Sequence, residues 1–422
     1  MHLELGSLPS KALLLTLYSG ILISSSSGKS IPHHLSHDKT RVALREASSD
    51  AAGFDYATQK IRGVNIGGWL VTEPWITPSV YETNNPAIID EKKEAGRRLR
   101  EHWDSFYTEA DFHTIKSFGL NHVRIPIGYW AFDVSGGEPY VQGQFDYLLQ
   151  AVGWSRNAGL KVLIDLDPRM DSITPAKGVQ LAGMKIKAML NGPKPRSPTQ
   201  VVVGIQALNE PAGFKNEHMV NTIKDFYKDS YDIVRHTSGP QTHLLLNIHD
   251  AFLPLSTWAN TFPPPQHHGV SLDTHIYTVF TPEGNKMSEQ ERIHEYCKKI
   301  PDIQASQSKI WTWVGEFTPA PTDCAPLLNG IGRGSRYDGS FEGSTRVGSC
   351  ESKTGLTSEF SEEYKESLGK FFEIQTKVYE HGSGWFMWTF KAEKADDWSY
   401  EAGVKGGWIP KNLDHKKYGV SC

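Results

Sequence analysis

Eight short apolar segments, spread between residues 61 and 390, constrain the fold of this 422-residue chain more than any other feature. Most are continuous apolar runs, which is typical of strands covered on both faces. Helical periodicity appears between them, as in residues 145–152, 223–234 and 362–379. The expected strands are residues 61–66, 122–127, 161–166, 201–208, 242–248, 270–275, 309–315 and 384–390. Strands alternating with helices in this number predict an α/β fold, a (β/α)8 TIM barrel.

The barrel is expected to occupy residues 57–422, which is longer than the ~250 residues typical of this fold. Long loops at the C-terminal face must therefore be present, and residues 129–142 and the Gly/Ser-rich residues 322–357 are the expected insertions. A doubly wound open sheet is the alternative fold. No Gly-x-Gly-x-x-Gly pattern follows the first strand, so the barrel is favoured.

The N-terminus is typical of a secretory signal. Lys11 precedes an apolar run over residues 12–23 that is too short to span a bilayer, and small residues follow it. We therefore expect a signal peptide over residues 1–26, a flexible leader or pro-segment over residues 27–56, and secretion to the extracellular space or cell wall. No later segment is long and apolar enough for a membrane helix.

The cysteine count and the charge limit the classes of partner. Four cysteines without Cys-x-x-Cys spacing fit two disulfides in an oxidising compartment, and the spacing leaves all three pairings open. No paired Cys or His spacing indicates a zinc site, so we expect neither a metal nor a cofactor. A net charge of −4 gives no reason to expect nucleic acid or an anionic membrane as partner.

Two glutamates, each closing an apolar strand-like run, are the strongest catalytic candidates. Glu210 closes the run that begins at Val201, and Glu316 closes the run that begins at Lys309. A carboxylate at the end of a buried strand usually lies where the strand meets a cleft. Taken alone, each is more often a capping or ion-pairing group. Two of them facing one cleft are the minimum needed to cleave a glycosidic bond.

The other strand ends favour the catalytic interpretation. In a TIM barrel function collects at the C-terminal ends of the strands, and here these ends carry Arg124, Asn209, His275, Tyr277 and Trp388. An arginine beside a carboxylate keeps it ionised and oriented, as a nucleophile requires. A general acid needs the opposite environment, with its pKa raised. Asp250 fits either a hydrogen bond at the rim or a substrate contact.

Six segments carry a resemblance to a known family: RGVNIGGWLVTEPW (62–75), NHVRIPIGYW (121–130), ALNEP (207–211), DTHIY (273–277), VGEF (314–317) and GWFMWTFK (384–391). The chain resembles glycoside hydrolase family 5, and specifically the secreted fungal exo-β-1,3-glucanases (glucan 1,3-β-glucosidases). The matching segments span the chain from about residue 61 to the C-terminus, and the first two are the most specific.

The resemblance implies a retaining hydrolase that releases β-glucose from the non-reducing end of β-1,3-glucan in the fungal cell wall. Glu316 would be the nucleophile and Glu210 the acid/base. A monomer with disulfides Cys297–Cys422 and Cys324–Cys350 is also implied. The residues that would bind the substrate are Glu73, Arg124, Asn209, His275, Tyr277, Phe280 and Trp388.

One segment departs from the family pattern. After the third strand the family reads IDLHGAPGSQNGF, whereas this chain reads IDLDPRMDS (164–172), so Asp167 stands where the family has a pocket histidine. Residues 167–200 represent either a true divergence or an error in the gene model. The alternatives are therefore a hydrolase of β-1,6-glucan or of lipid β-glucosides, or a catalytically impaired glucan-binding barrel.

Overall fold

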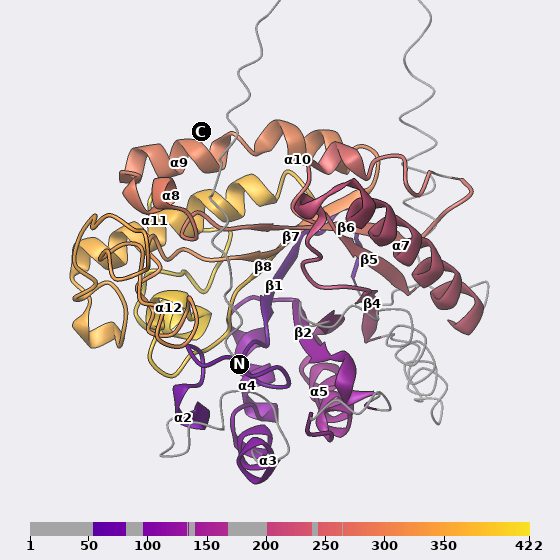
Figure 1. Cartoon of the computed structure of the whole chain (residues 1–422), viewed down its shortest axis with the longest axis horizontal. Coiled ribbons are helices and arrows are strands. Elements are labelled where there is room, and N and C mark those ends of the chain that lie inside the picture. Colours follow the sequence, from indigo (N-terminus) through magenta and orange to yellow (C-terminus); the bar gives the residue numbers. More distant parts are fainter. Residues whose placement is uncertain are drawn as a thin grey trace, which may run out of the picture.

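Eight parallel strands close into a barrel in the order β1 to β8, each hydrogen-bonded to the next and β8 to β1 (Figure 1). The computed structural model describes residues 54–81, 96–132, 134, 140–167, 201–238, 244–263 and 265–422. The predicted TIM barrel is thereby confirmed. The strands are β1 (Ile61–Asn65), β2 (His122–Gly128), β3 (Lys161–Asp167), β4 (Val202–Gln206), β5 (Leu245–His249), β6 (Val270–Ile276), β7 (Trp311–Phe317) and β8 (Gly384–Met387).

Helices surround this barrel, and short 3-10 turns follow several strands. The helices are α2 (Pro78–Tyr81), α3 (Gly96–Ser105), α4 (Glu109–Ser117), α5 (Gln144–Ala158), α7 (Glu217–Ser238), α8 (Pro282–Lys286), α9 (Glu289–Cys297), α10 (Ile300–Gln307), α11 (Glu362–Tyr379) and α12 (Tyr400–Lys405). The 3-10 turns are η2 (Tyr129–Ala131), η3 (Gly213–Lys215), η4 (Leu255–Thr257), η5 (Thr357–Glu359) and η6 (Asp396–Trp398).

Strand boundaries differ from the sequence prediction at several strands: β8 ends at Met387 and not at residue 390, and β7 begins at Trp311 and not at residue 309. The backbone N–H groups of Lys309 and Ile310 donate to the carbonyl of Ser306, so these two residues close α10 instead of starting the strand. The strand then runs through Glu316 to Phe317. It pairs with β6 across a register shift between Thr274 and His275. This shift brings the two C-terminal ends into the same layer of side chains.

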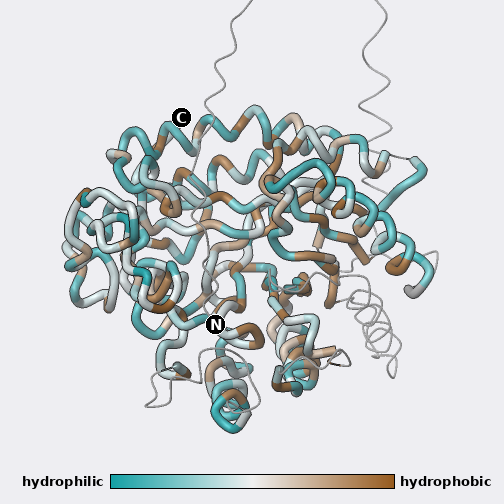
Figure 2. The backbone as a smooth tube through the Cα atoms, in the orientation of Figure 1, coloured by the Kyte–Doolittle hydropathy of each residue, from teal (hydrophilic) through white to brown (hydrophobic). Residues whose placement is uncertain are grey.

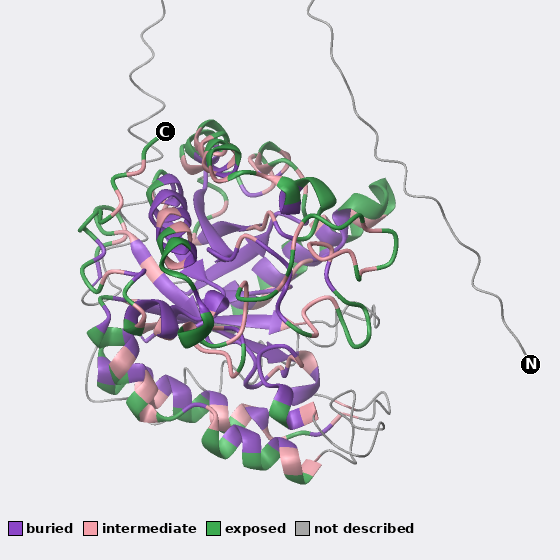
Figure 3. Ribbon diagram, turned by 90° about the vertical axis from the view of Figure 1, so that its left-hand side faces the viewer, coloured by how far each residue is buried: buried purple, intermediate pink, exposed green. Residues whose placement is uncertain are grey.

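Apolar side chains fill the N-terminal end of the barrel interior and the space between strands and helices, whereas buried polar side chains such as Arg124 and Asp273 lie in its C-terminal part. Figure 3 shows buried strands throughout, with intermediate and exposed residues on the outer faces of the helices. Figure 2 shows apolar residues gathered on the inner elements and polar residues along the outer helices. The cluster at the N-terminal end of the barrel is Phe54, Ile61, Leu163, Leu245, Trp311, Trp313 and Phe386.

Two aromatic residues that precede the expected start of the barrel at residue 57 pack against it. Phe54 is buried at the N-terminal end of the barrel, and the hydroxyl of Tyr56 lies 2.9 Å from Nε2 of His122. These two side chains therefore pack with the barrel and not with a leader. The predicted signal peptide and residues 27–53 of the predicted leader lie outside the described residues.

Two disulfides join segments of the C-terminal half. Cys297 at the end of α9 is bonded to Cys422, and Cys324 is bonded to Cys350 within the long loop between β7 and α11. This is the pairing that the family resemblance implies. The loop is further held by Asp323, whose carboxylate accepts hydrogen bonds from Ser335 and Arg336. In the described part of the chain, no helix has the length and hydropathy needed to cross a membrane.

Candidate active site

Arg124 organises the polar interior at the C-terminal end of the barrel. It lies on β2, is fully buried, and donates to Oε1 of Glu316 at 2.8 Å and to Oδ1 of Asn209 at 2.9 Å. It also donates to Gln206 and lies 3.1 Å from Asp165. Burial opposes the charge of Arg124, but the carboxylates around it raise its pKa above the usual value. A permanent cation is thus fixed beneath the site.

Glu316 is held by a donor on each carboxylate oxygen. Arg124 donates to Oε1, and the hydroxyl of Tyr277 donates to Oε2 at 2.8 Å. Burial raises the pKa of Glu316, while the positive charges of His275 and Arg124 oppose this and Glu210 adds to it. The sequence predicted that an arginine beside this carboxyl keeps it ionised; Arg124 does favour the ionised form, but burial is the largest influence on the pKa of Glu316 and raises it.

Glu210 lies four residues beyond β4, in the turn that leads to η3, and not at the strand end as the sequence suggested. Its backbone has a φ of 44°, in the left-handed region that non-glycine residues rarely adopt. The N–H of Asn209 donates to the carbonyl of Leu166 at the end of β3, which fixes the start of this turn. The turn directs the half-buried carboxyl of Glu210 towards β6.

His275 joins the two glutamates. Its Nδ1 lies 2.7 Å from Oε1 of Glu210 and 3.6 Å from Oε2 of Glu316. These two carboxylate oxygens are therefore at most 6.3 Å apart, the sum of the two distances. Burial alone would lower the pKa of His275, but Glu316, Asp273 and the hydrogen bond to Glu210 raise it well above the usual value. A cationic imidazole between two carboxyl groups is the result.

Aromatic side chains and Glu73 surround the two glutamates. Trp388 is largely buried after β8 and belongs to an apolar cluster with Trp75, and the ring of Phe280 is 39% exposed. The ring centroids of Phe280 and Tyr277 lie 5.4 Å apart. Trp75 donates to Glu73 at 2.9 Å, and burial raises the pKa of Glu73 to about 8. The site thus has a partly exposed aromatic ring, Phe280, and a buried carboxyl group, Glu73, whose pKa favours the protonated form at neutral pH.

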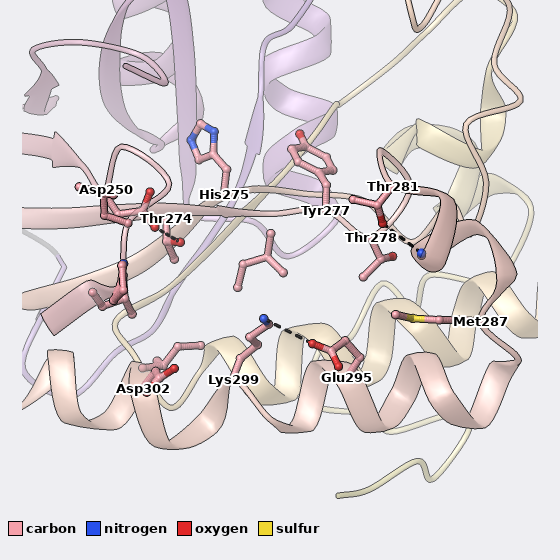
Figure 4. Close-up of a pocket in the computed structure, with 16 residues that line it drawn as sticks. Asp250, Thr274, His275, Tyr277, Thr278, Thr281, Met287, Glu295, Lys299 and Asp302 are labelled. Atoms are coloured by element: carbon pink, nitrogen blue, oxygen red, sulfur yellow. Dashed lines mark hydrogen bonds and ion pairs between the residues drawn. The ribbon is translucent and has the colours of Figure 1, made fainter. Parts of the chain in front are cut away.

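The two faces of β6 contact different parts of the molecule. Figure 4 shows His275 and Tyr277 leaving the strand on one side and Thr274 on the other, where a pocket of about 340 Å³ separates β6 from α9 and α10. Thr274 donates to Asp250 at 2.6 Å, and the N–H of Phe252 also donates to that carboxylate. Asp250 therefore forms the rim hydrogen bonds that were one of its two expected roles.

The structure brings together the predicted residues and adds others. Hydrogen bonds link Arg124 with Asn209 and Glu316, Glu316 with Tyr277, and His275 with Glu210; the ion pair of His275 with Glu316 at 3.6 Å joins these two groups into one network. Asp165 and Asp273 belong to it but were not singled out as site residues. Each lies two positions before a residue at a strand end, and period-two alternation puts such residues on the same face of a strand. That spacing was the available signal.

Asp167 ends β3, where its backbone pairs with Gly128 of β2. The charge of Asp167 contributes to the raised pKa values of Glu73 and Asp165. The rest of the segment that departs from the family, residues 168–200, lies outside the described residues. The site is therefore more acidic on the side of β3 than one with a histidine at this position.

Comparison with known proteins finds relatives that cover most of this chain. A sequence profile described as "Cellulase (glycosyl hydrolase family 5)" matches residues 89–317. The "Glucan 1,3-beta-glucosidase" of Blumeria graminis is 40% identical over 398 residues, covering 87% of this chain and 91% of that protein. The "Probable glucan 1,3-beta-glucosidase A" of Aspergillus niger is 39% identical, covering 90% and 94%.

Solved structures share the fold. The crystal structure of rutinosidase from Aspergillus niger superposes with a TM-score of 0.61 at 15% identity, covering 84% of this chain and 99% of that one. A broad-specificity endoglucanase from Clostridium acetobutylicum gives a TM-score of 0.53 at 14% identity, covering 84% and 95%. At such identities only the fold is established. The family profile and the close sequence relatives show that the chain belongs to glycosyl hydrolase family 5.

Proposed function

We propose that this protein is a retaining exo-hydrolase that releases β-glucose from the non-reducing end of β-1,3-glucan. The proposal rests on the contact of the His275 imidazole with both glutamates. This contact limits the distance between Oε1 of Glu210 and Oε2 of Glu316 to at most 6.3 Å. Retaining enzymes hold their carboxyl groups about 5–5.5 Å apart, and inverting enzymes about 6.5–9.5 Å. The upper limit is below the inverting range.

In the first step, an oxygen of Glu316 attacks the anomeric carbon while the bond to the departing sugar breaks. Glu210 gives its proton to the departing oxygen, so that a glycosyl ester on Glu316 and a shortened glucan result. Two donors, Arg124 and Tyr277, orient the attacking carboxylate.

In the second step, Glu210 removes a proton from water, whose oxygen bonds to the anomeric carbon as the ester to Glu316 breaks. His275 contacts both carboxyl groups, and its positive charge balances whichever of them is ionised. Inversion occurs twice, so the released glucose has the β configuration. The cycle returns Glu210 to its protonated form and Glu316 to its ionised form.

The choice of β-1,3-glucan is supported by the names of the close relatives and by the shape of the site. Oδ1 of Asn209 accepts from Arg124, which leaves its amide N–H groups to donate to a hydroxyl of the terminal sugar. Trp388 would form the floor of the terminal sugar site, and Phe280 would contact the next sugar. Glu73 would bond further hydroxyl groups of the terminal sugar. Secretion to the cell wall and a monomeric state belong to the same proposal.

The carboxylate of Asp167 supports a second candidate for the substrate. A carboxylate at the end of β3, in place of the family histidine, changes one wall of the sugar site, so β-1,6-glucan or a lipid β-glucoside is the alternative substrate. A catalytically impaired glucan-binding barrel is the alternative from another class. The complete network around both glutamates argues against the impaired barrel.

Proton NMR of laminarin digests tests the proposal. The wild-type protein should produce β-glucose as the first anomer, and Glu316→Gln should be inactive because no glycosyl ester can form. First appearance of α-glucose would contradict retention. Activity on β-1,6-glucan or a glucosyl lipid but not on laminarin would favour the alternative substrates, and binding of laminarin without turnover would favour the impaired barrel.

A further inference from the structure

Three side chains of the types that bind metals, two of them within the candidate active site, lie close together. Among the described residues, Glu210, His249 and His275 each offer one ligand atom, and these atoms lie within 4.8 Å of one another. His249 ends β5 and has no exposed surface, and its ring packs edge-on against that of His275 with centroids 4.4 Å apart. His249 has no part in the proposed reaction, so its placement here needs another account.

The hydrogen bonds of His249 leave one ring nitrogen without a partner. Its Nδ1 accepts from the backbone N–H of Ala251 at 2.9 Å, so the ring is neutral, as a metal ligand must be. Its Nε2 is buried and has no hydrogen-bond partner among the described residues. A buried imidazole nitrogen without a partner is costly, because burial removes it from water without compensation. Because Nδ1 accepts, Nε2 carries the ring proton in this arrangement, and a metal ion would bind Nε2 in place of that proton.

Each of the two histidines also has a carboxylate near its other nitrogen. Nε2 of His275 lies 3.6 Å from Asp273, and Nδ1 of His249 lies 3.5 Å from Asp250. Histidines that bind metals commonly donate their second N–H to a carboxylate, which fixes the ring and strengthens the ligand. For His249 this requires the proton to move to Nδ1 and the ring to turn from Ala251 towards Asp250.

From this arrangement we propose that Glu210, His249 and His275 form a site for a divalent transition metal of the zinc class, and that its occupancy inhibits the enzyme. Zinc binds imidazole nitrogen and carboxylate oxygen at about 2.0–2.2 Å, so donors that share one ion lie within about 4.4 Å of each other. Side-chain movements of less than about 1 Å bring the three donors into that range.

Coordination displaces the proton between His275 and Glu210 to solvent, and the freed nitrogen and the carboxylate oxygen both bond the metal. Glu210 then has no proton to give to the departing sugar, which is why occupancy inhibits. The inhibition rests on the proposed function, whereas the metal site itself does not. Binding and inhibition are therefore measured separately.

The binding experiment uses the full chain, freed of metals by chelator, in equilibrium dialysis against zinc. His249→Phe keeps a planar aromatic ring, somewhat larger than imidazole, and removes a ligand, and it should weaken zinc binding at this site at least about tenfold. The matched control is the double variant His267→Gln with His268→Gln, an accessible histidine pair away from the site, which should keep it. Calcium, which requires more oxygen ligands, should not bind.

In parallel, zinc should inhibit hydrolysis of an aryl β-glucoside by the wild type and by the control variant. His249→Phe, compared with its own activity without zinc, should need at least about tenfold more zinc for the same inhibition. If His249→Phe fails to fold, zinc dialysis of Glu210→Gln replaces it and should show the same weakening. Unchanged zinc binding in these variants, or none in the wild type, would overturn the proposal. An inactive protein that binds zinc through His249 would refute only the proposed function.

Discussion

Replacing Tyr277 by Phe removes a single hydroxyl group from the candidate active site. That hydroxyl donates to Oε2 of Glu316 at 2.8 Å and leaves the bond from Arg124 to Oε1 untouched. A hydrogen bond to a charged group contributes about 1.5–3 kcal/mol. Since it stabilises the ionised carboxylate, its loss should raise the pKa of Glu316 by about 1–2 pH units, at 1.36 kcal/mol for each unit.

The sign of the effect on activity follows from the role of Glu316. The nucleophile must be ionised, so a higher pKa moves the acid limb of the kcat/KM profile to higher pH by the same about 1–2 units. At a pH on that limb, kcat/KM of Tyr277→Phe should be about 10- to 100-fold below wild type. At higher pH the difference should shrink, because Glu316 is then ionised in both the wild type and Tyr277→Phe.

The assay is hydrolysis of an aryl β-glucoside across pH, with Tyr379→Phe as the matched control. Tyr379 on α11 is fully buried, whereas Tyr277 is partly buried, and the hydroxyl of Tyr379 donates to Gln375 of the same helix at 3.1 Å. Its loss should lower the free energy of unfolding by about 0.5–1.5 kcal/mol and leave the pH profile in place. An acid limb of Tyr277→Phe that stays put or moves to lower pH would refute the reasoning.

Three further outcomes are expected. Glu210→Ala should lose activity on laminarin but give β-glucosyl azide from an activated aryl glucoside when azide is added; α-glucosyl azide would contradict retention. In Gly315→Ala, the new Cβ would collide with both carboxylate oxygens of Asp273. The melting temperature should fall by an amount equivalent to about 1–3 kcal/mol, and an unchanged melting temperature would refute this contact. Asp167→Asn removes a negative charge that raises the pKa of Glu73, which is about 8 in the native protein. The pH dependence of KM should therefore move to lower pH, and an unchanged pH dependence would show that Asp167 does not influence the pKa of Glu73.

The barrel was predictable from the sequence because each strand is buried on both faces and therefore appears as an apolar run. The same reasoning placed Glu316 and Arg124, since a charged residue within or after such a run marks the end that faces a cleft. The boundaries were less predictable. Residues 309 and 310 look like a strand by composition, but hydrogen bonds to Ser306 place them in the turn after α10.

His249 was missed for a related reason. The fifth strand was expected to stop at residue 248, which left His249 as the first residue of a loop. The structure instead ends β5 at His249, and alternation from Leu245 through Asn247 puts its side chain on the inner face. Its contact with His275 depends on how β5 and β6 are aligned, with His249 paired to Asp273, and one sequence does not specify that alignment.

Trapping of the covalent intermediate tests the central claim most directly. A 2-deoxy-2-fluoro-β-glucoside with an activated leaving group should form the glycosyl ester on the nucleophile and release it slowly, because the fluorine slows both steps. Mass spectrometry should find one sugar per chain, and peptide mapping should place it on Glu316. A label on Glu210 or on another carboxylate, or turnover of the substrate with no label at all, would contradict the assignment of the two glutamates.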